Sequence, residues 1–295
     1  MTSNEWKSKG KFIQVNNHRL FVIDSNNGIN TSQKSMVILH GYPTSSFDYY
    51  KVLPELSKNY RVILHDHLGF GFSDKPKDVN YSLVIQADIA LELWCQLGLK
   101  KIFLFAHDYG TSVATEIIAR YNANELDIEI EQLILTNGSI HIELSQLRTI
   151  QKLLKHKFLG KYVAKLTNFL IFKKNMKNIY FDTSKVTDNE LKEMWKLIEL
   201  NGGRKVIHKL TQYINERYLH WNRWIGALKE TQISTKIIWA KNDPIAVPAI
   251  AKLLAKEIPN NTLYWIENTG HFLMLENPKE LLELILKNNF TNKLN

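Results

Sequence analysis

The segment Ile102-Phe-Leu-Phe-Ala106-His107-Asp108-Tyr109-Gly110-Thr-Ser-Val113 combines a strand, a sharp turn and the start of a helix. An apolar run of strand length ends at Ala106, and helical periodicity begins just after Gly110. Both of these residues are small, as the neighbours of a side chain at the apex of such a turn must be. The turn therefore exposes the Asp108 side chain at the carboxyl end of a buried strand.

A carboxylate in this position can displace a leaving group at carbon and form an alkyl-enzyme ester, whereas serine-esterase chemistry suits it poorly. Hydrolysis of such an ester requires a histidine base and an acid that orients the base. Asp243 follows one predicted strand in Trp239-Ala-Lys-Asn-Asp-Pro244, and His271 follows the last one in Asn268-Thr-Gly-His271. We therefore predict Asp108 as nucleophile, Asp243 as acid and His271 as base.

The stretch His40-Gly-Tyr-Pro43 directly follows another predicted strand, 36–39. Its turn can direct the backbone N–H of Tyr42 at the active centre, beside the N–H of Tyr109. These two groups are predicted to form an oxyanion hole for the hydrolysis of the ester. All four motifs lie at strand ends, where open α/β sheets bind their ligands.

Alternative roles remain open for several of these residues. Asp108 could instead cap the helix that begins near Gly110. Glu143 also follows a predicted strand and could replace Asp243 as the acid, although Asp243 lies directly at a strand end. The triplet His65-Asp-His67 resembles a metal cluster. Alternation along a strand would direct its aspartate away from both histidines, so we predict structural roles there and no metal.

The apolar runs predict a mostly parallel eight-stranded sheet with helices on both faces. The predicted strands are 11–15, 20–23, 36–39, 60–64, 102–106, 133–135, 236–239 and 263–266, and the predicted helices of the sheet domain are 46–56, 82–97, 111–121 and 278–287. Roughly 95 residues of helical pattern separate two of these strands, which is too long for an ordinary connection. We therefore predict a core domain formed by 1–138 and 227–295, with a helical cap inserted over 139–226.

Composition and charge limit the classes of function. With 295 residues and 44% hydrophobic composition, the chain can bury a large core. No stretch approaches the roughly 20 apolar residues of a membrane span, and the start lacks the apolar region of a signal peptide, so we expect a cytoplasmic protein. The lone cysteine, Cys95, is expected in the core.

The formal net charge is +9, and the excess is concentrated in the predicted cap. Residues 148–209 contain about fifteen Lys and Arg against about five acids. No nucleic-acid motif accompanies these basic residues. We interpret them as the solvated face of amphipathic helices rather than as a surface for nucleic acid or anionic membrane. The sequence leaves the oligomeric state open.

With these motifs established, the chain resembles the haloalkane dehalogenase and epoxide hydrolase branch of the α/β-hydrolases, and within it the group of mesoderm-specific transcript protein-like hydrolases. The stretches that support the resemblance are His40-Gly-Tyr-Pro-Thr-Ser-Ser-Phe-Asp-Tyr49, Leu68-Gly-Phe-Gly-Phe-Ser-Asp-Lys-Pro76, His107-Asp-Tyr-Gly110, Gln212-Tyr-Ile-Asn215 and Trp224-Ile-Gly-Ala-Leu228. The resemblance implies an α/β-hydrolase fold, the site roles given above, and no cofactor.

The substrate prediction follows from departures from the family pattern. Haloalkane dehalogenases usually have asparagine at the position of Tyr42 and tryptophan at that of Tyr109, and these side chains hold the departing halide. Both donors are replaced here. An epoxide hydrolase-like reaction on a small apolar electrophile is therefore favoured over dehalogenation. A non-catalytic binding protein with the same fold is the third hypothesis.

Epoxide hydrolases protonate the opening ring with two cap tyrosines, one of them in a Trp-Tyr-Arg stretch. The matching stretch here is Trp221-Asn222-Arg223, and asparagine is a poorer acid that can still donate a hydrogen bond. Tyr213, in the matching stretch Gln212-Tyr-Ile-Asn215, is the predicted substitute, with core packing as its alternative role. We therefore predict Tyr213, Trp221 and Asn222 as substrate-binding residues.

Overall fold

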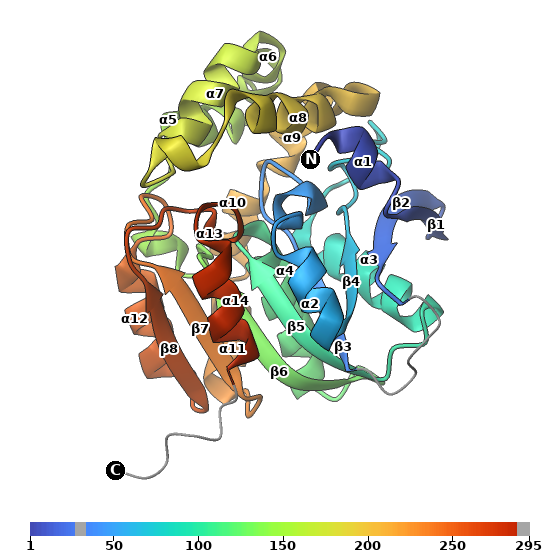
Figure 1. Cartoon of the computed structure of the whole chain (residues 1–295), viewed down its shortest axis with the longest axis vertical. Coiled ribbons are helices and arrows are strands. Elements are labelled where there is room, and N and C mark those ends of the chain that lie inside the picture. The colour runs from blue at the N-terminus through green and yellow to red at the C-terminus, as the bar shows by residue number, and fades with distance from the viewer. Residues whose placement is uncertain (27–33, 288–295) are drawn as a thin grey trace.

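The central element of the computed structural model, which describes residues 1–26 and 34–287, is one eight-stranded sheet (Figure 1). Its strands are β1 (Lys11–Val15), β2 (His18–Asp24), β3 (Ser35–Leu39), β4 (Arg61–His65), β5 (Lys101–His107), β6 (Glu129–Thr136), β7 (Thr235–Ala240) and β8 (Asn261–Ile266). They are arranged in the order β1-β2-β4-β3-β5-β6-β7-β8. The predicted eight-stranded α/β fold is confirmed.

The six strands β4, β3, β5, β6, β7 and β8 pair in parallel in this order. The other two are antiparallel: β1 pairs with β2, and β2 pairs with β4. Continuous apolar runs form the parallel strands because helices cover both faces of the sheet. All six residues of β7 and the last six of β5 are buried. The carboxyl ends of β3, β5, β7 and β8 lie at the same edge, which places the four predicted motifs together.

Helices cover both faces of the sheet in Figure 1. The helices α2 (Leu53–Asn59) and α14 (Pro278–Leu286) lie in front of it. The opposite face holds α3 (Leu83–Gln96), α4 (Tyr109–Asn122), α11 (Trp221–Glu230) and α12 (Pro248–Glu257). Three shorter elements, α1 (Ser3–Lys7), η1 (Ser46–Tyr49) and α13 (Leu273–Glu276), complete the sheet domain.

Helices separate β6 from β7 and form the upper part of the molecule in Figure 1. They are η2 (Ile142–Leu144), α5 (Thr149–Leu154), α6 (Gly160–Leu166), α7 (Phe169–Lys177), η3 (Thr183–Lys185), α8 (Asp188–Glu199), η4 (Leu200–Lys205), α9 (Ile207–Leu210) and α10 (Tyr213–Leu219). We call this helical segment the cap. None of the helices within residues 1–26 and 34–287 is long and apolar enough to cross a lipid bilayer.

Two details differ from the sequence prediction. The predicted end of the cap at residue 226 falls inside α11, which continues unbroken to Glu230. This helix packs on α4, where the Trp224 indole N–H donates to Glu116 over 2.8 Å. Cys95 is exposed rather than in the core, because α3 buries Leu93 and Trp94 and turns the following residues outward.

The contact between α4 and β3 fixes the turn before α4. A β-carbon added to Gly110 would lie 2.2 Å from the carbonyl oxygen of Leu39, which is far inside van der Waals contact. Only glycine lets the first turn of α4 approach the strand so closely. The small residue that the motif required is therefore explained by a backbone contact.

This contact predicts opposite effects for two glycine substitutions. Gly110→Ala should lower the free energy of unfolding by about 1–3 kcal/mol or more, because the added methyl group forces α4 away from β3. Gly226→Ala should raise it by about 0.5–1 kcal/mol, since no atom lies within 4 Å of that β-carbon and alanine favours a helix. Urea denaturation of both variants measures the difference. Equal effects would contradict the proposed close approach.

Candidate active site

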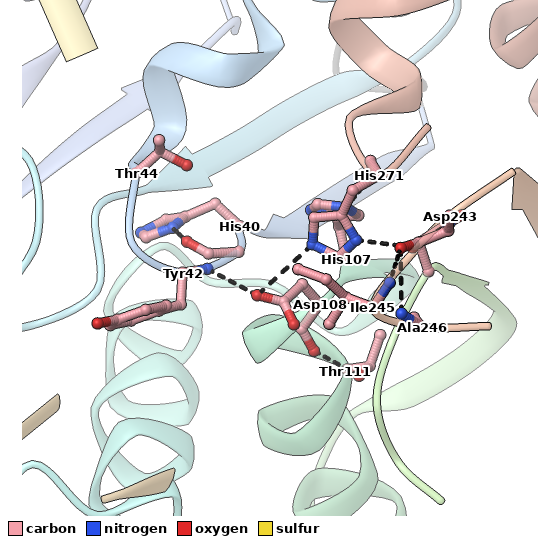
Figure 2. Close-up of polar contacts among 12 residues, drawn as sticks. His40, Tyr42, Thr44, His107, Asp108, Thr111, Asp243, Ile245, Ala246 and His271 are labelled. Atoms are coloured by element: carbon pink, nitrogen blue, oxygen red, sulfur yellow. Dashed lines mark hydrogen bonds and ion pairs between the residues drawn. The ribbon is translucent and has the colours of Figure 1, made fainter. Parts of the chain in front are cut away.

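Asp108 occupies the turn between β5 and α4 with φ 43° and ψ −107°. A non-glycine residue in such a conformation costs about 1–3 kcal/mol and is found mainly where function requires it. The side chain of Asp108 makes no capping hydrogen bond to α4, so helix capping is not its role. Its carbonyl oxygen instead accepts hydrogen bonds from the Thr111 N–H (3.1 Å) and hydroxyl (2.6 Å), which hold the turn closed (Figure 2).

The imidazole of His271 lies between two carboxylates. Its Nδ1 is 2.7 Å from Oδ2 of Asp243, and its Nε2 is 4.0 Å from Oδ2 of Asp108 (Figure 2). The first distance is that of a strong hydrogen bond, and the second is too long for one. The histidine is therefore oriented by Asp243, with its other nitrogen directed toward Asp108.

Asp243 is itself held in place by neighbouring groups. Its Oδ1 accepts hydrogen bonds from the backbone N–H groups of Ile245 (2.7 Å) and Ala246 (3.1 Å). Its Oδ2 accepts a further one from the Asn137 side-chain amide at 2.5 Å. Asn137 follows β6, so a fifth strand end contributes to the site. The sequence analysis did not identify this residue. The network fixes the Asp243 carboxylate toward His271.

Glu143, the alternative acid, is engaged elsewhere. Its carboxylate is 2.7 Å from Nδ1 of His141 and accepts a hydrogen bond from the Trp221 indole at 2.9 Å. The other nitrogen of His141 lies 2.8 Å from Glu257 on α12. This cluster joins the base of the cap to the core. The contact with His271 belongs to Asp243.

The backbone N–H of Tyr42 donates to Oδ2 of Asp108 over 3.0 Å. The loop after β3 comes this close because Gly41 has no side chain, and a β-carbon there would be 2.8 Å from Nδ1 of His107. Tyr109 is the first residue of α4, so its N–H has no acceptor within the helix. The positive end of the α4 dipole adds to these donors beside the Asp108 carboxylate.

Burial and charge act in opposite directions on the histidines of the site. Burial opposes the protonation of His271, but its hydrogen bond with Asp243 and the negative charges of Asp243 and Asp108 prevail and raise its pKa above 6.5. Burial lowers the pKa of His107 and of His40 to about 4. The neutral His107 ring lies beside His271, with its Nε2 2.9 Å from the His271 carbonyl oxygen. The titratable base of the site is therefore His271.

Arg217 of α10 is a site residue that the sequence analysis missed. Its guanidinium is buried and donates to Ser112 Oγ (2.7 Å) and to the carbonyl oxygen of Asp108 (3.1 Å). It also lies 3.7 Å from Oδ1 of Asp108 and 4.5 Å from the centre of the Tyr213 ring. The signal was helical spacing, since Tyr213, Ile214 and Arg217 share the buried face of α10. The cap thereby places a positive charge beside the turn.

A cavity lies between the cap and the strand ends. Its floor includes Asp108, His271 and the Tyr42 side chain, and its walls are mainly apolar cap residues: Ile150, Leu154, Phe172, Met176, Ile198 and Ile207. Arg148, Gln151 and Asn175 add polar groups. The space open to the centres of water molecules is about 80 Å³. Among the described residues, no group of three His, Cys, Asp or Glu side chains is placed to hold a metal ion.

The three predicted substrate-binding residues lie in different places. Tyr213 is buried behind the cavity wall, where its hydroxyl accepts a hydrogen bond from Gln151 at 3.1 Å and its ring packs on Tyr42. Trp221 and Asn222 begin α11. The first contacts Glu143, and the second lies in a surface depression with Ala119 and Asn122 of α4. Because α11 faces α4 rather than the cavity, we leave these two residues out of the proposed site.

A strand-turn-helix site with an acid and a histidine at later strand ends defines a class of enzyme fold. The chain belongs to the α/β-hydrolase fold family, whose profile, described as alpha/beta hydrolase fold, matches residues 34–278. It is 38% identical over 286 residues to the mesoderm-specific transcript protein of Mus musculus, covering 95% of this chain and 85% of that protein. It is 32% identical over 282 residues to the putative hydrolase LipZ of Mycobacterium tuberculosis, covering 96% of both.

Solved structures share the fold at lower sequence identity. Haloalkane dehalogenase DbeA from Bradyrhizobium elkani superposes with a TM-score of 0.79 at 18% identity, covering 94% of this chain and 95% of that one. Epoxide hydrolase CorEH superposes with a TM-score of 0.74 at 19% identity, covering 94% and 96%. The predicted relation to this branch of hydrolases is confirmed at the level of the fold.

The buried contacts of Arg217 predict that this residue stabilises the packing of the cap on the Asp108 turn. Arg217→Gln should lower the free energy of unfolding by about 1–3 kcal/mol, because buried acceptors at the turn lose their donors. Arg217→Lys should not restore it, since an ammonium group lacks the planar arrangement of donors. Arg223→Gln is the matched control: its side chain is half exposed, and the buried Glu116 that it pairs with keeps Arg120 and Trp224 as donors, so the change should stay within about 1 kcal/mol. Urea denaturation measures all three, and equal losses at both arginines would contradict this role.

Proposed function

We propose that this protein is a hydrolase that forms a covalent ester between Asp108 and its substrate, and that an epoxide on a small apolar molecule is the preferred electrophile. The main support is the position of the His271 Nε2 4.0 Å from Oδ2 of Asp108, with the Nδ1 held by Asp243. The apolar cavity above Asp108 suits a substrate of this class. No cofactor takes part in the proposed reaction.

In the first step, Oδ1 of Asp108 attacks a ring carbon of the epoxide and the ring carbon–oxygen bond breaks. Oδ2 stays with the Tyr42 N–H and becomes the carbonyl oxygen of the ester. The ring oxygen takes the electron pair of the broken bond and requires a proton. This step yields a hydroxyalkyl ester without loss of any atom of the substrate.

Tyr213 is our candidate for the proton donor. The Tyr42 hydroxyl lies 2.9 Å from Thr211 Oγ1, which donates to the Ile207 carbonyl, so the Tyr42 proton is directed at Thr211. The Tyr213 hydroxyl accepts from Gln151, which leaves its own proton for another acceptor. Gln151 lines the cavity and must move aside for Tyr213 to reach the substrate. Burial raises the pKa of Tyr213, yet an alkoxide is a strong enough base to take this proton.

In the second step, a water molecule between His271 and the ester attacks the carbonyl carbon. His271 takes the proton of the water, and the backbone N–H groups of Tyr42 and Tyr109 stabilise the developing oxyanion. The bond between the acyl carbon and the alkyl oxygen breaks, and the leaving alkoxide takes the remaining proton of the water to give the diol, so Asp108 is again a carboxylate. His271 finally returns a proton to Tyr213, which completes the cycle.

Dehalogenation is the second candidate because its attack on carbon uses the same carboxylate. It requires donors for the departing halide. The Tyr109 ring is buried against His67, Phe70 and Tyr213, and the Tyr42 hydroxyl is directed at Thr211. Neither side chain supplies the N–H donor that halide release uses in the dehalogenases. A non-catalytic binding protein remains the third candidate.

Replacing the base should trap the ester. His271→Gln should react with styrene oxide and gain the mass of the whole epoxide, because ester formation does not require His271 whereas hydrolysis does. A haloalkane would instead add its alkyl group in place of one hydrogen. Mass spectrometry of the intact protein distinguishes the two products. The variant that also contains Asp108→Asn is the control and should gain no mass.

A single turnover of the unmodified protein in heavy-oxygen water tests the same route independently. Water attacks the ester carbonyl, so the label should enter the peptide that contains Asp108, while other acidic peptides stay unlabelled. Turnover with all the label in the product would contradict the covalent mechanism. Absence of both mass gain and turnover with epoxides and haloalkanes would favour the binding protein.

The pH dependence follows from the raised pKa of His271. Only the neutral imidazole accepts a proton from water, so kcat should fall toward acid. In the ester intermediate the negative charge of Asp108 is lost, and the hydrogen bond and charge of Asp243 are what continue to raise the pKa of His271. Asp243→Asn removes the carboxylate that raises this pKa, and it should move the midpoint to lower pH while also lowering kcat. Steady-state rates across the pH range measure both, with circular dichroism as the check on folding. An unchanged midpoint would show that another group limits the rate.

A further inference from the structure

The outer surface of the cap presents large apolar side chains to solvent. Two of them, Phe158 and Leu159, lie just before α6; Tyr162 and Leu166 lie on α6, and Leu170 lies at the start of α7. We call these five residues the cap ridge. Leu166 and Leu170 are 74% and 72% exposed. Isolated exposed apolar residues are ordinary, but a concentration of them marks an interaction surface. Figure 1 places α6 at the outer end of the cap, away from the sheet.

Basic residues alternate in the sequence with three members of the cap ridge. Phe158, Tyr162 and Leu166 recur every four residues, and Lys157, Lys161 and Lys165 recur with the same spacing one position earlier. Lys157 and Phe158 lie in the turn before α6, while Lys161, Tyr162, Lys165 and Leu166 lie on α6, where the basic and the apolar residues are neighbours on its exposed side. The buried side of α6 consists of small residues, Gly160 and Ala164. The helix therefore directs its large apolar and its basic side chains outward.

The charge around the cap ridge has one sign. From Arg148 to Phe181 the chain contains nine Lys and Arg residues and no Asp or Glu. Within the described part of the chain, two of the nine form ion pairs, Lys173 and Lys177, both with Asp188 of α8. Lys157, Lys161 and Lys165 beside the cap ridge are exposed, and the Lys161 ammonium lies 4.9 Å from the centre of the Tyr162 ring.

We propose that the cap ridge docks on an anionic lipid membrane, with its apolar side chains in the headgroup boundary and its lysines on the lipid phosphates and carboxylates. Interfacial helices bind in this way, through buried apolar area together with attraction to acidic lipids. A second copy of the chain would present the same positive charge and be repelled. A nucleic acid would pair with the lysines but leave Leu166 and Leu170 in water. This proposal departs from the sequence interpretation of these residues as a solvated basic face.

The cap ridge and the cavity meet at α7, which contains Leu170 of the ridge. On α7, Phe172 and Met176 line the cavity, and Ile171 lines it while being 38% exposed. Thr167 lines the cavity directly after Leu166 of the cap ridge. An apolar molecule dissolved in the bilayer therefore has a short path to Asp108. We infer that the substrate is lipid-derived, an inference that rests on the proposed function, whereas the docking itself does not.

Vesicle binding tests the docking. The full chain should sediment with vesicles of phosphatidylcholine and phosphatidylserine and remain in solution with phosphatidylcholine alone, with binding that weakens as salt rises. The variant Lys157→Gln/Lys161→Gln/Lys165→Gln should bind about a hundredfold more weakly. The variant Phe158→Ser/Leu166→Ser/Leu170→Ser should lose at least about tenfold, because it keeps the charge and loses the apolar contact.

Controls keep the result specific. The variant Lys252→Gln/Lys256→Gln/Lys279→Gln removes the same charge from α12 and α14, on the sheet domain, and should bind like the unmodified protein. All substituted side chains are exposed, so thermal unfolding should be unchanged. No binding to acidic vesicles at low salt would overturn the proposal, as would equal losses in both lysine variants. Self-association that the serine substitutions abolish would overturn the proposal in favour of a second copy of the chain. DNA binding that the serine substitutions leave unchanged would overturn it in favour of a nucleic acid.

An activity measurement separates the docking from the proposed reaction. If epoxides are hydrolysed, the cap ridge variants should turn over styrene oxide in solution normally and a long-chain epoxide in acidic vesicles at least about tenfold more slowly. Equal rates on both substrates would overturn the delivery of substrate from the membrane. If no epoxide is hydrolysed, the proposed function fails, and vesicle binding still decides the docking.

Discussion

Asp108 is held at φ 43°, a backbone conformation that an L-amino acid adopts at a cost of about 1–3 kcal/mol. Contacts from three directions maintain it. The first turn of α4 lies against β3 at Gly110, the hydroxyl of Thr111 closes the turn, and Arg217 reaches the Asp108 carbonyl from the cap. This conformation directs the carboxylate toward the cavity. The Tyr42 N–H and the His271 imidazole can approach the carboxylate only because it is held there.

The cap is part of the active site as well as its cover. Arg217 joins α10 to the Asp108 turn, and Gln151 of α5 joins the cavity wall to Tyr213. In the proposed reaction, proton donation by Tyr213 would therefore require Gln151 of the cap to move aside. The outer surface of the same cap contains the cap ridge, so a membrane that binds there would act on the helices that enclose the substrate.

Much of the fold and of the catalytic centre could be predicted from the sequence. Strands of a parallel sheet are continuous apolar runs, and side chains that follow their carboxyl ends meet at one edge, so the proximity of Asp108, Asp243 and His271 could be predicted from local pattern. Asn137 was missed because nothing in the local sequence marks it, and helical spacing could place Arg217 on the buried face of α10 but not beside Asp108. Each contributes through a partner more than 100 residues away in the sequence. Asn222 matched a family position, yet α11 faces α4 at that point.

The sequence by itself determined the order of strands and helices, the sharp turn at Asp108 and the spacing of Lys157, Lys161 and Lys165, because these depend on local periodicity and on the size of neighbouring side chains. Only the tertiary structure decided that Asp243 rather than Glu143 contacts His271, and that Tyr162 and Leu166 of α6 remain in solvent. Both are outcomes of packing between distant segments, since several elements compete for the same buried space and hydrogen-bonding groups.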